Sequence, residues 1–66
     1  MNEPITLLRI RDVVARTGLA RATIYRLAAK GEFPAPIRLL GRNTAFPSNL
    51  VDKWITQQID ADAARH

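Results

Sequence analysis

One segment constrains the fold more than any other: residues 17–27, with the sequence TGLARATIYRL. Gly18 separates two short helical patterns, and glycine readily adopts the positive φ that a tight turn between two helices needs. In the second pattern Ile24, Leu27 and Ala28 recur at i, i+3 and i+4, so one face of that helix can be buried. The segment therefore predicts a helix-turn-helix.

The opposite face of the second helix is predicted to be exposed and cationic. It carries Arg21, Ala22, Tyr25, Arg26 and Ala29. Such a face complements the phosphate-lined groove of duplex DNA, into which a helix of this kind fits. We therefore interpret this helix as the part of the chain that reads DNA.

Size and composition limit the alternatives. The 66 residues suffice for one small domain, and the chain has no cysteine and a single histidine, His66, which we expect to be inert. Packing, rather than disulfides or zinc, must then stabilise the fold. No apolar run approaches the ~20 residues of a membrane span and residues 1–6 lack a signal-peptide pattern, which predicts a cytoplasmic protein without a membrane partner.

Positive charge is concentrated in the first two thirds of the chain. The net charge is +4 and the pI is about 10.8, which favours a polyanionic partner. Eight basic and three acidic residues precede Ser48, whereas two basic and three acidic residues follow Pro47. Solvation of a small domain explains such a composition equally well, so only the positions of the arginines can distinguish a DNA-binding surface from a solvated one.

The sequence offers no basis for catalysis. There is no cysteine nucleophile and no internal histidine, and the carboxylates are dispersed. Asp60 and Asp62 are two residues apart and diverge on a helix, while Gly41 stands alone instead of forming a phosphate loop. We expect a protein that is not an enzyme, with no cofactor, no metal site and no small-molecule substrate.

The remaining elements follow from local patterns. Helices are expected at about 11–16 and about 21–30, the second ending at Gly31, and the prolines of residues 33–36 exclude a helix there. Residues 37–39 and 44–46 are predicted strands of a hairpin with an arginine at its tip. A third helix opens after Pro47 with Ser48 as N-cap, and its apolar stripe closes the core. The stripe consists of Leu50, Val51, Trp54, Ile55 and Ile59.

The predicted fold is therefore mainly α with a small β-hairpin, in the order of a winged helix-turn-helix. We assign residues 8–59 to this domain, residues 1–7 to a flexible N-terminal arm and residues 60–66 to a frayed C-terminal tail. Trp54 is assigned to the core rather than to a surface for stacking bases.

In order and spacing, five segments resemble the AlpA-type prophage regulators, relatives of MerR-like winged helix-turn-helix proteins and of phage excisionases. They are residues 9–13 (RIRDV), 17–19 (TGL), 21–27 (RATIYRL), 31–36 (GEFPAP) and 51–55 (VDKWI). The resemblance covers about residues 8–59. It implies a cytoplasmic bacterial or phage protein that binds DNA as a transcriptional regulator, often of genes for excision of mobile elements.

Two positions depart from that family's pattern. Ala20 stands where serine usually precedes the recognition helix, and alanine cannot accept a hydrogen bond from the first-turn amides, at a cost of roughly 1 kcal/mol. Thr23 is an alternative cap for a shortened helix. Phe46 replaces a common tryptophan, a change that bears on packing of the wing.

We predict nine DNA-binding residues. They are Arg21, Ala22, Thr23, Tyr25, Arg26, Lys30, Arg38, Arg42 and Asn43. Arg21 and Arg26 either bridge guanine O6 and N7 or contact a phosphate, unless they are solvated or paired internally. Thr23 contacts a phosphate or a thymine methyl group, or only caps and packs, and Tyr25 donates its hydroxyl to a phosphate or covers the edge of the core.

The other predicted contacts are peripheral. Ala22 is small and lets the helix approach the bases. Arg42 and Asn43 at the wing tip face a backbone or a minor groove, although asparagine equally suits a turn. Lys30 and Arg38 contact outlying phosphates unless they are merely solvated.

Three functions remain open at this point. The first is a sequence-specific transcriptional regulator of prophage or mobile-element genes, with the second helix in the major groove and the wing on flanking DNA. The second is an excisionase-like architectural factor that uses the same surface, and the third is a protein-interaction adaptor that uses the third helix. Double-stranded DNA is the expected partner, with a homodimer or cooperative oligomer forming on it.

Overall fold

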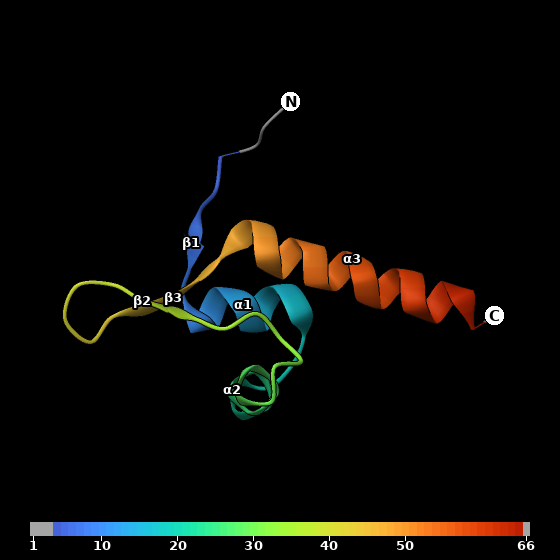
Figure 1. Cartoon of the computed structure of the whole chain (residues 1–66), viewed down its shortest axis with the longest axis horizontal. Helices are drawn as coiled ribbons and strands as arrows, with labels where there is room; N and C mark the ends of the chain where they lie inside the picture. Colours follow the sequence, from blue (N-terminus) through green and yellow to red (C-terminus); the bar gives the residue numbers. More distant parts are fainter. Residues whose placement is uncertain (1–3, 66) are drawn as a thin grey trace.

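The computed structural model describes residues 4–65, which form three helices and three short strands (Figure 1). The order is β1 (Leu7–Leu8), α1 (Ile10–Thr17), α2 (Arg21–Ala29), β2 (Ile37–Arg38), β3 (Thr44–Pro47) and α3 (Ser48–Ala64). The strands form an antiparallel sheet in the order β1-β3-β2. This arrangement confirms the predicted mainly α, winged helix-turn-helix fold. The outer part of the predicted arm (residues 1–3) and His66 lie outside the described residues.

A glycine with positive φ follows each helix of the helix-turn-helix. Gly18 follows α1 with φ of 75°, as the turn requires, and Gly31 follows α2 with φ of 78°. At the end of α2 the Glu32 N–H donates to the Leu27 carbonyl (2.9 Å) and the Gly31 N–H to the Ala28 carbonyl (3.1 Å). These two bonds are those of a Schellman motif, which satisfies the last carbonyls of the helix and turns the chain toward the prolines.

The hairpin forms at the predicted place. Ile37 of β2 pairs with Ala45 of β3, and Arg38 pairs with Thr44. The loop between the two strands, residues 39–43, extends away from the helices (Figure 1). We call β2, this loop and β3 the wing.

Strand β1 is an element that the sequence analysis does not predict. It pairs antiparallel with β3, with Leu7 opposite Pro47 and Leu8 opposite Phe46. Since β1 begins at Leu7 and α3 continues to Ala64, regular structure extends past both ends of residues 8–59. The division into arm, domain and tail stays a prediction.

The prediction that Ser48 is an N-cap is wrong. Pro47 occupies the N-cap, and Ser48 is the first residue of α3 and is buried. The Thr6 N–H donates to Ser48 Oγ (2.8 Å), while the Ser48 N–H donates to the Thr6 carbonyl (2.7 Å). The serine hydroxyl thus satisfies a backbone amide just before β1 instead of the first turn of its own helix, and it ties the N-terminal segment to α3.

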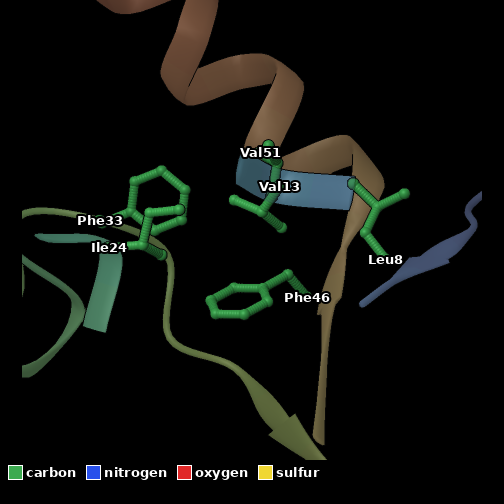
Figure 2. Packing of buried hydrophobic residues seen from close by; sticks show 6 residues of the cluster. All are labelled: Leu8, Val13, Ile24, Phe33, Phe46 and Val51. Carbon is green, nitrogen blue, oxygen red and sulfur yellow. The ribbon is translucent and has the colours of Figure 1, made fainter. Parts of the chain in front are cut away.

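A single hydrophobic cluster joins all the helices and two of the strands. Its buried members are Leu8, Val13, Ile24, Phe33, Phe46 and Val51 (Figure 2). The Phe46 ring lies among them, with its centroid 6.0 Å from that of Phe33. Phe46, which the sequence analysis relates to packing of the wing, is therefore a central core residue, and the wing strand β3 is anchored through it.

Trp54 is part of this packing, as predicted. Its ring lies edge-on to Phe33 at a centroid distance of 4.8 Å, and its Nε1–H donates to the Glu32 carbonyl (2.8 Å). Trp54 is half-buried and packs against the core cluster. Trp54 therefore joins α3 to the segment that follows α2.

The apolar stripe of α3 is only partly buried. Val51 is buried and Ile55 is half-buried, but Leu50 is 43% exposed and Ile59 is 63% exposed. A helix of 17 residues is about 25 Å long, and α3 projects beyond the rest of the molecule (Figure 1). The predicted burial of Leu50 and Ile59 is therefore wrong: Ile59 lies on the projecting C-terminal half of α3, and Leu50 is exposed in its first turn.

Candidate nucleic-acid interface

Helix α2 has the two faces that the sequence predicts. Ile24 is buried, while Leu27 and Ala28 are half-buried against the core. The residues predicted to face outward are all exposed: Arg21, Ala22, Tyr25, Arg26 and Ala29. A cationic helix face is therefore available to a partner.

The first turn of α2 is uncapped. Ala20 is the N-cap, with extended backbone (φ −69°, ψ 150°) and no side-chain acceptor, and no acidic residue lies in the first turn. The helix nevertheless begins at Arg21, so the alternative in which Thr23 caps a shortened helix is wrong. Thr23 is half-buried within the first turn. The partial positive charge of this helix end thus lies beside the Arg21 side chain and is not offset by an acidic side chain of that turn.

The fold brings two further arginines next to Arg21. Arg9, Ile10, Arg11 and Arg21 line one shallow depression of about 390 Å³ between the starts of α1 and α2. Both Arg9 and Arg11 are exposed. Neither arginine is among the nine predicted DNA-binding residues, although the positive charge at the start of the first helix is visible in the sequence. Three arginines lining one depression suit a phosphate backbone.

Tyr25 connects α2 to the wing. Its ring centroid lies 6.2 Å from that of Phe46 on β3, with the ring planes tilted by 47°. The residue is 37% exposed, so the ring covers the edge of the core while part of the side chain still reaches solvent. Of the two roles considered for Tyr25, the structure shows the packing role.

The wing carries its polar residues at the surface. Arg38, Arg42 and Asn43 are all exposed. At the tip the Leu39 N–H donates to the Asn43 carbonyl (2.7 Å), and Asn43 Nδ2 donates to the Leu40 carbonyl (3.3 Å). Asn43 therefore has the turn-forming role that was one of its two predicted interpretations.

Not all predicted residues gather in one place. Lys30 is the C-cap of α2, at the opposite end of a nine-residue helix from Arg21, which places them about 13 Å apart along the axis.

Within residues 4–65 ion pairs join Arg16 to Asp52 and Arg65 to Asp62, and neither pair involves a cation of the predicted interface. Internal pairing thus does not explain Arg21 or Arg26 in the described structure.

A helix-turn-helix with cations on its second helix, followed by a basic wing, defines a DNA-binding protein of the winged helix-turn-helix class. Among proteins of this class, the chain belongs to the AlpA family of prophage regulatory proteins. The model of that family, described as prophage CP4-57 regulatory protein (AlpA), matches residues 6–59. The family is one of regulatory proteins acting on DNA.

One relative comes from a bacteriophage. The chain is 42% identical over 52 residues to the uncharacterized protein ORF88 of Enterobacteria phage P4. The matched segment is 79% of this chain and 59% of that relative, so the chain spans about three fifths of the length of the relative. No solved structure matches significantly. Among the helices of residues 4–65, none has the length and apolar character needed to cross a bilayer.

Proposed function

We propose that this protein is a sequence-specific, DNA-binding transcriptional regulator of prophage or mobile-element genes that acts in the cytoplasm. Helix α2 enters the major groove and the wing lies on flanking DNA. The observation that carries the proposal is the exposed cationic face of α2, whose first residue, Arg21, shares a depression with Arg9 and Arg11.

The N-terminal part of α2 makes the reading contacts in this proposal. Arg21 and Arg26 donate to guanine O6 and N7 or to phosphate oxygens, since a guanidinium group fits both. Ala22 allows the helix to approach the base edges, and Thr23 is placed for a thymine methyl group or a phosphate. The start of α1 crosses the backbone, where Arg9 and Arg11 contact phosphates.

The wing makes the flanking contacts. Arg38 and Arg42 neutralise phosphates beside the groove read by α2, and the remaining polar groups of Asn43 face the minor groove or its edge. Tyr25 positions α2 against β3 and directs its hydroxyl to the backbone between the two contact regions, while Lys30 makes an outlying phosphate contact. A few arginines on one small module give only modest affinity for DNA. Binding of a homodimer or cooperative oligomer to adjacent DNA sites therefore raises the occupancy of those sites.

Two other functions are each favoured by a different observation. Membership in a family related to excisionases favours an architectural role in recombination, in which the same surface binds DNA. A protein-interaction adaptor would instead use α3, where Leu50 and Ile59 are exposed. If the protein is an adaptor, loss of Arg21 and Arg26 should leave its activity unchanged. If it is an architectural factor, excision in vitro should depend on the protein.

The test compares binding to duplexes from around the coding region of the protein with binding to shuffled duplexes at about 0.15 M salt. Specific binding is expected to exceed non-specific binding by about 10³-fold or more. In the same assay Arg26→Ala is expected to weaken binding by about 1–3 kcal/mol and to relax sequence preference if the side chain reads a base. A phosphate contact would instead weaken all duplexes alike and reduce the salt slope by about one.

Lys53→Ala serves as the matched control, because Lys53 is an exposed cation on α3 outside the proposed interface. It removes the same charge and should leave both affinity and sequence preference nearly unchanged. Equal affinity for coding-region and shuffled duplexes would refute the proposed function, and so would equal losses for Arg26→Ala and Lys53→Ala.

A further inference from the structure

An apolar side chain stands at the tip of the basic wing. Leu40 is 91% exposed, more than any other large apolar residue among those described, whereas its neighbour Leu39 is half-buried. Turn positions ordinarily hold Gly, Asn, Asp or Ser, so neither packing nor turn chemistry calls for leucine there. The Leu40 side chain is therefore free to contact a partner.

The loop that carries Leu40 is held by its own hydrogen bonds. The Leu39 N–H donates to the Asn43 carbonyl at 2.7 Å, and the Asn43 side chain donates to the Leu40 carbonyl at 3.3 Å. Gly41 has φ of 69°, which lets the backbone reverse directly after Leu40. These contacts fix the backbone of Leu40 while its side chain projects into solvent.

The surroundings of Leu40 are cationic. Arg38 and Arg42 are exposed on either side of it, and no carboxylate occurs anywhere in residues 33–51. An apolar protein surface would match Leu40 but would leave both guanidinium groups unpaired. Duplex DNA matches all three, because phosphates flank the minor groove and the apolar faces of two neighbouring bases become accessible when the step between them is opened.

We propose that Leu40 is a wedge that enters the minor groove and opens one base step, so that the bound duplex bends. Arg38 and Arg42 hold the phosphates on either side of the opened step. Leucine is among the side chains that insert between base steps in this way and bend DNA by about 20–90°. The inference rests on the proposed function, since it assigns Leu40 to the same DNA complex.

The test uses duplexes that the 66-residue chain selects from a random pool. Bending is measured by energy transfer between dyes at the two ends of the duplex, and unstacking by the fluorescence of 2-aminopurine placed at successive steps beside the region contacted by α2. The unmodified chain is expected to bend the duplex and to raise the fluorescence at one step. Leu40→Ser should abolish both signals and weaken binding by on the order of tenfold or less, because loss of the wedge also removes the cost of unstacking.

Two variants serve as controls. Leu40→Met keeps a large apolar side chain and should retain the bend, and Ile59→Ser removes another exposed apolar residue far along α3 and should change nothing. Melting curves of all three variants should match that of the unmodified chain, because neither Leu40 nor Ile59 is packed in the core.

Each adverse outcome has a distinct meaning. If no duplex is selected, the proposed function fails and this inference fails with it. If a selected duplex stays straight, or if Leu40→Ser bends it as the unmodified chain does, the inference alone is overturned. It is also overturned if Leu40→Ser lowers only the cooperative binding of a second copy and keeps the bend, because Leu40 would then be a contact between proteins.

Discussion

Replacing Ala20 by serine should stabilise the protein, because the N-cap of α2 already has the backbone that a capping residue needs. Its φ and ψ are −69° and 150°, and the Ile24 N–H already donates to the Ala20 carbonyl (3.1 Å). A serine Oγ on this backbone can accept the N–H of Ala22 or Thr23, one of the first-turn donors without an intrahelical partner. Ala20 is exposed, so the hydroxyl displaces no packed group.

The size of the effect follows from the chain length. An N-cap serine in place of alanine contributes about 1 kcal/mol to the free energy of unfolding. Unfolding entropy is about 2.1 cal/mol/K per residue, or roughly 0.14 kcal/mol/K for this chain, so Ala20→Ser should raise Tm by about 7 °C. In a marginally stable small domain this is a large fraction of the total stability.

The assay is thermal and urea unfolding followed by far-ultraviolet circular dichroism. Ala29→Ser is the matched control: it places the same side chain at the exposed last residue of the same helix, where no capping bond forms, and should lower stability by about 0.5 kcal/mol through helix propensity. If Ala20→Ser leaves Tm unchanged or lowers it while Ala29→Ser behaves as expected, the reasoning about the uncapped first turn is refuted.

Two further substitutions probe the turn and the core. Gly18→Ala should lower the free energy of unfolding by about 1–2 kcal/mol, because φ of 75° disfavours a Cβ even though no atom crowds the site. Urea titration checks this, and Gly18→Asn should lose less; equal losses would contradict the conformational argument. Trp54→Phe should cost about 0.5–1.5 kcal/mol by removing the 2.8 Å bond to the Glu32 carbonyl while keeping a ring beside Phe33. Calorimetric unfolding measures it, and unchanged stability would show that water replaces the bond without loss.

Helix positions were predictable because their signals are local. The pattern of Ile24, Leu27 and Ala28 and the glycine at position 31 predicted a helix at about 21–30, and α2 runs from Arg21 to Ala29. The missing cap at Ala20 was equally visible, since it depends on one side chain. The hairpin followed from strand alternation and the turn residues between the strands.

Long-range contacts account for what the sequence analysis missed. Strand β1 is two residues long, and its pairing with β3 joins positions about 40 residues apart, so no local period marks it. The hydroxyl of Ser48 serves the Thr6 amide rather than its own helix for the same reason. Leu50 continues the apolar stripe of α3 in sequence, but the exposure of its side chain depends on whether another part of the fold covers that side of the helix.

The candidate site, too, was only partly predictable from the sequence. The outward face of α2 was predictable, because helical periodicity alone separates Arg21 and Arg26 from Ile24. The proximity of Arg9 and Arg11 to Arg21 was not, because it depends on how the starts of α1 and α2 pack together. Their roles on DNA stay predictions until the binding experiments above are done.

The sequence by itself determined the element types, the turn at Gly18 and the cationic face of α2, because periodicity, φ preference and charge act over a few residues. Only the tertiary structure decided that Phe46 anchors the wing in the core, that three arginines line one depression and that Leu40 is left exposed at the wing tip. These features are set by which surfaces the core buries, and burial depends on contacts between segments far apart in the chain.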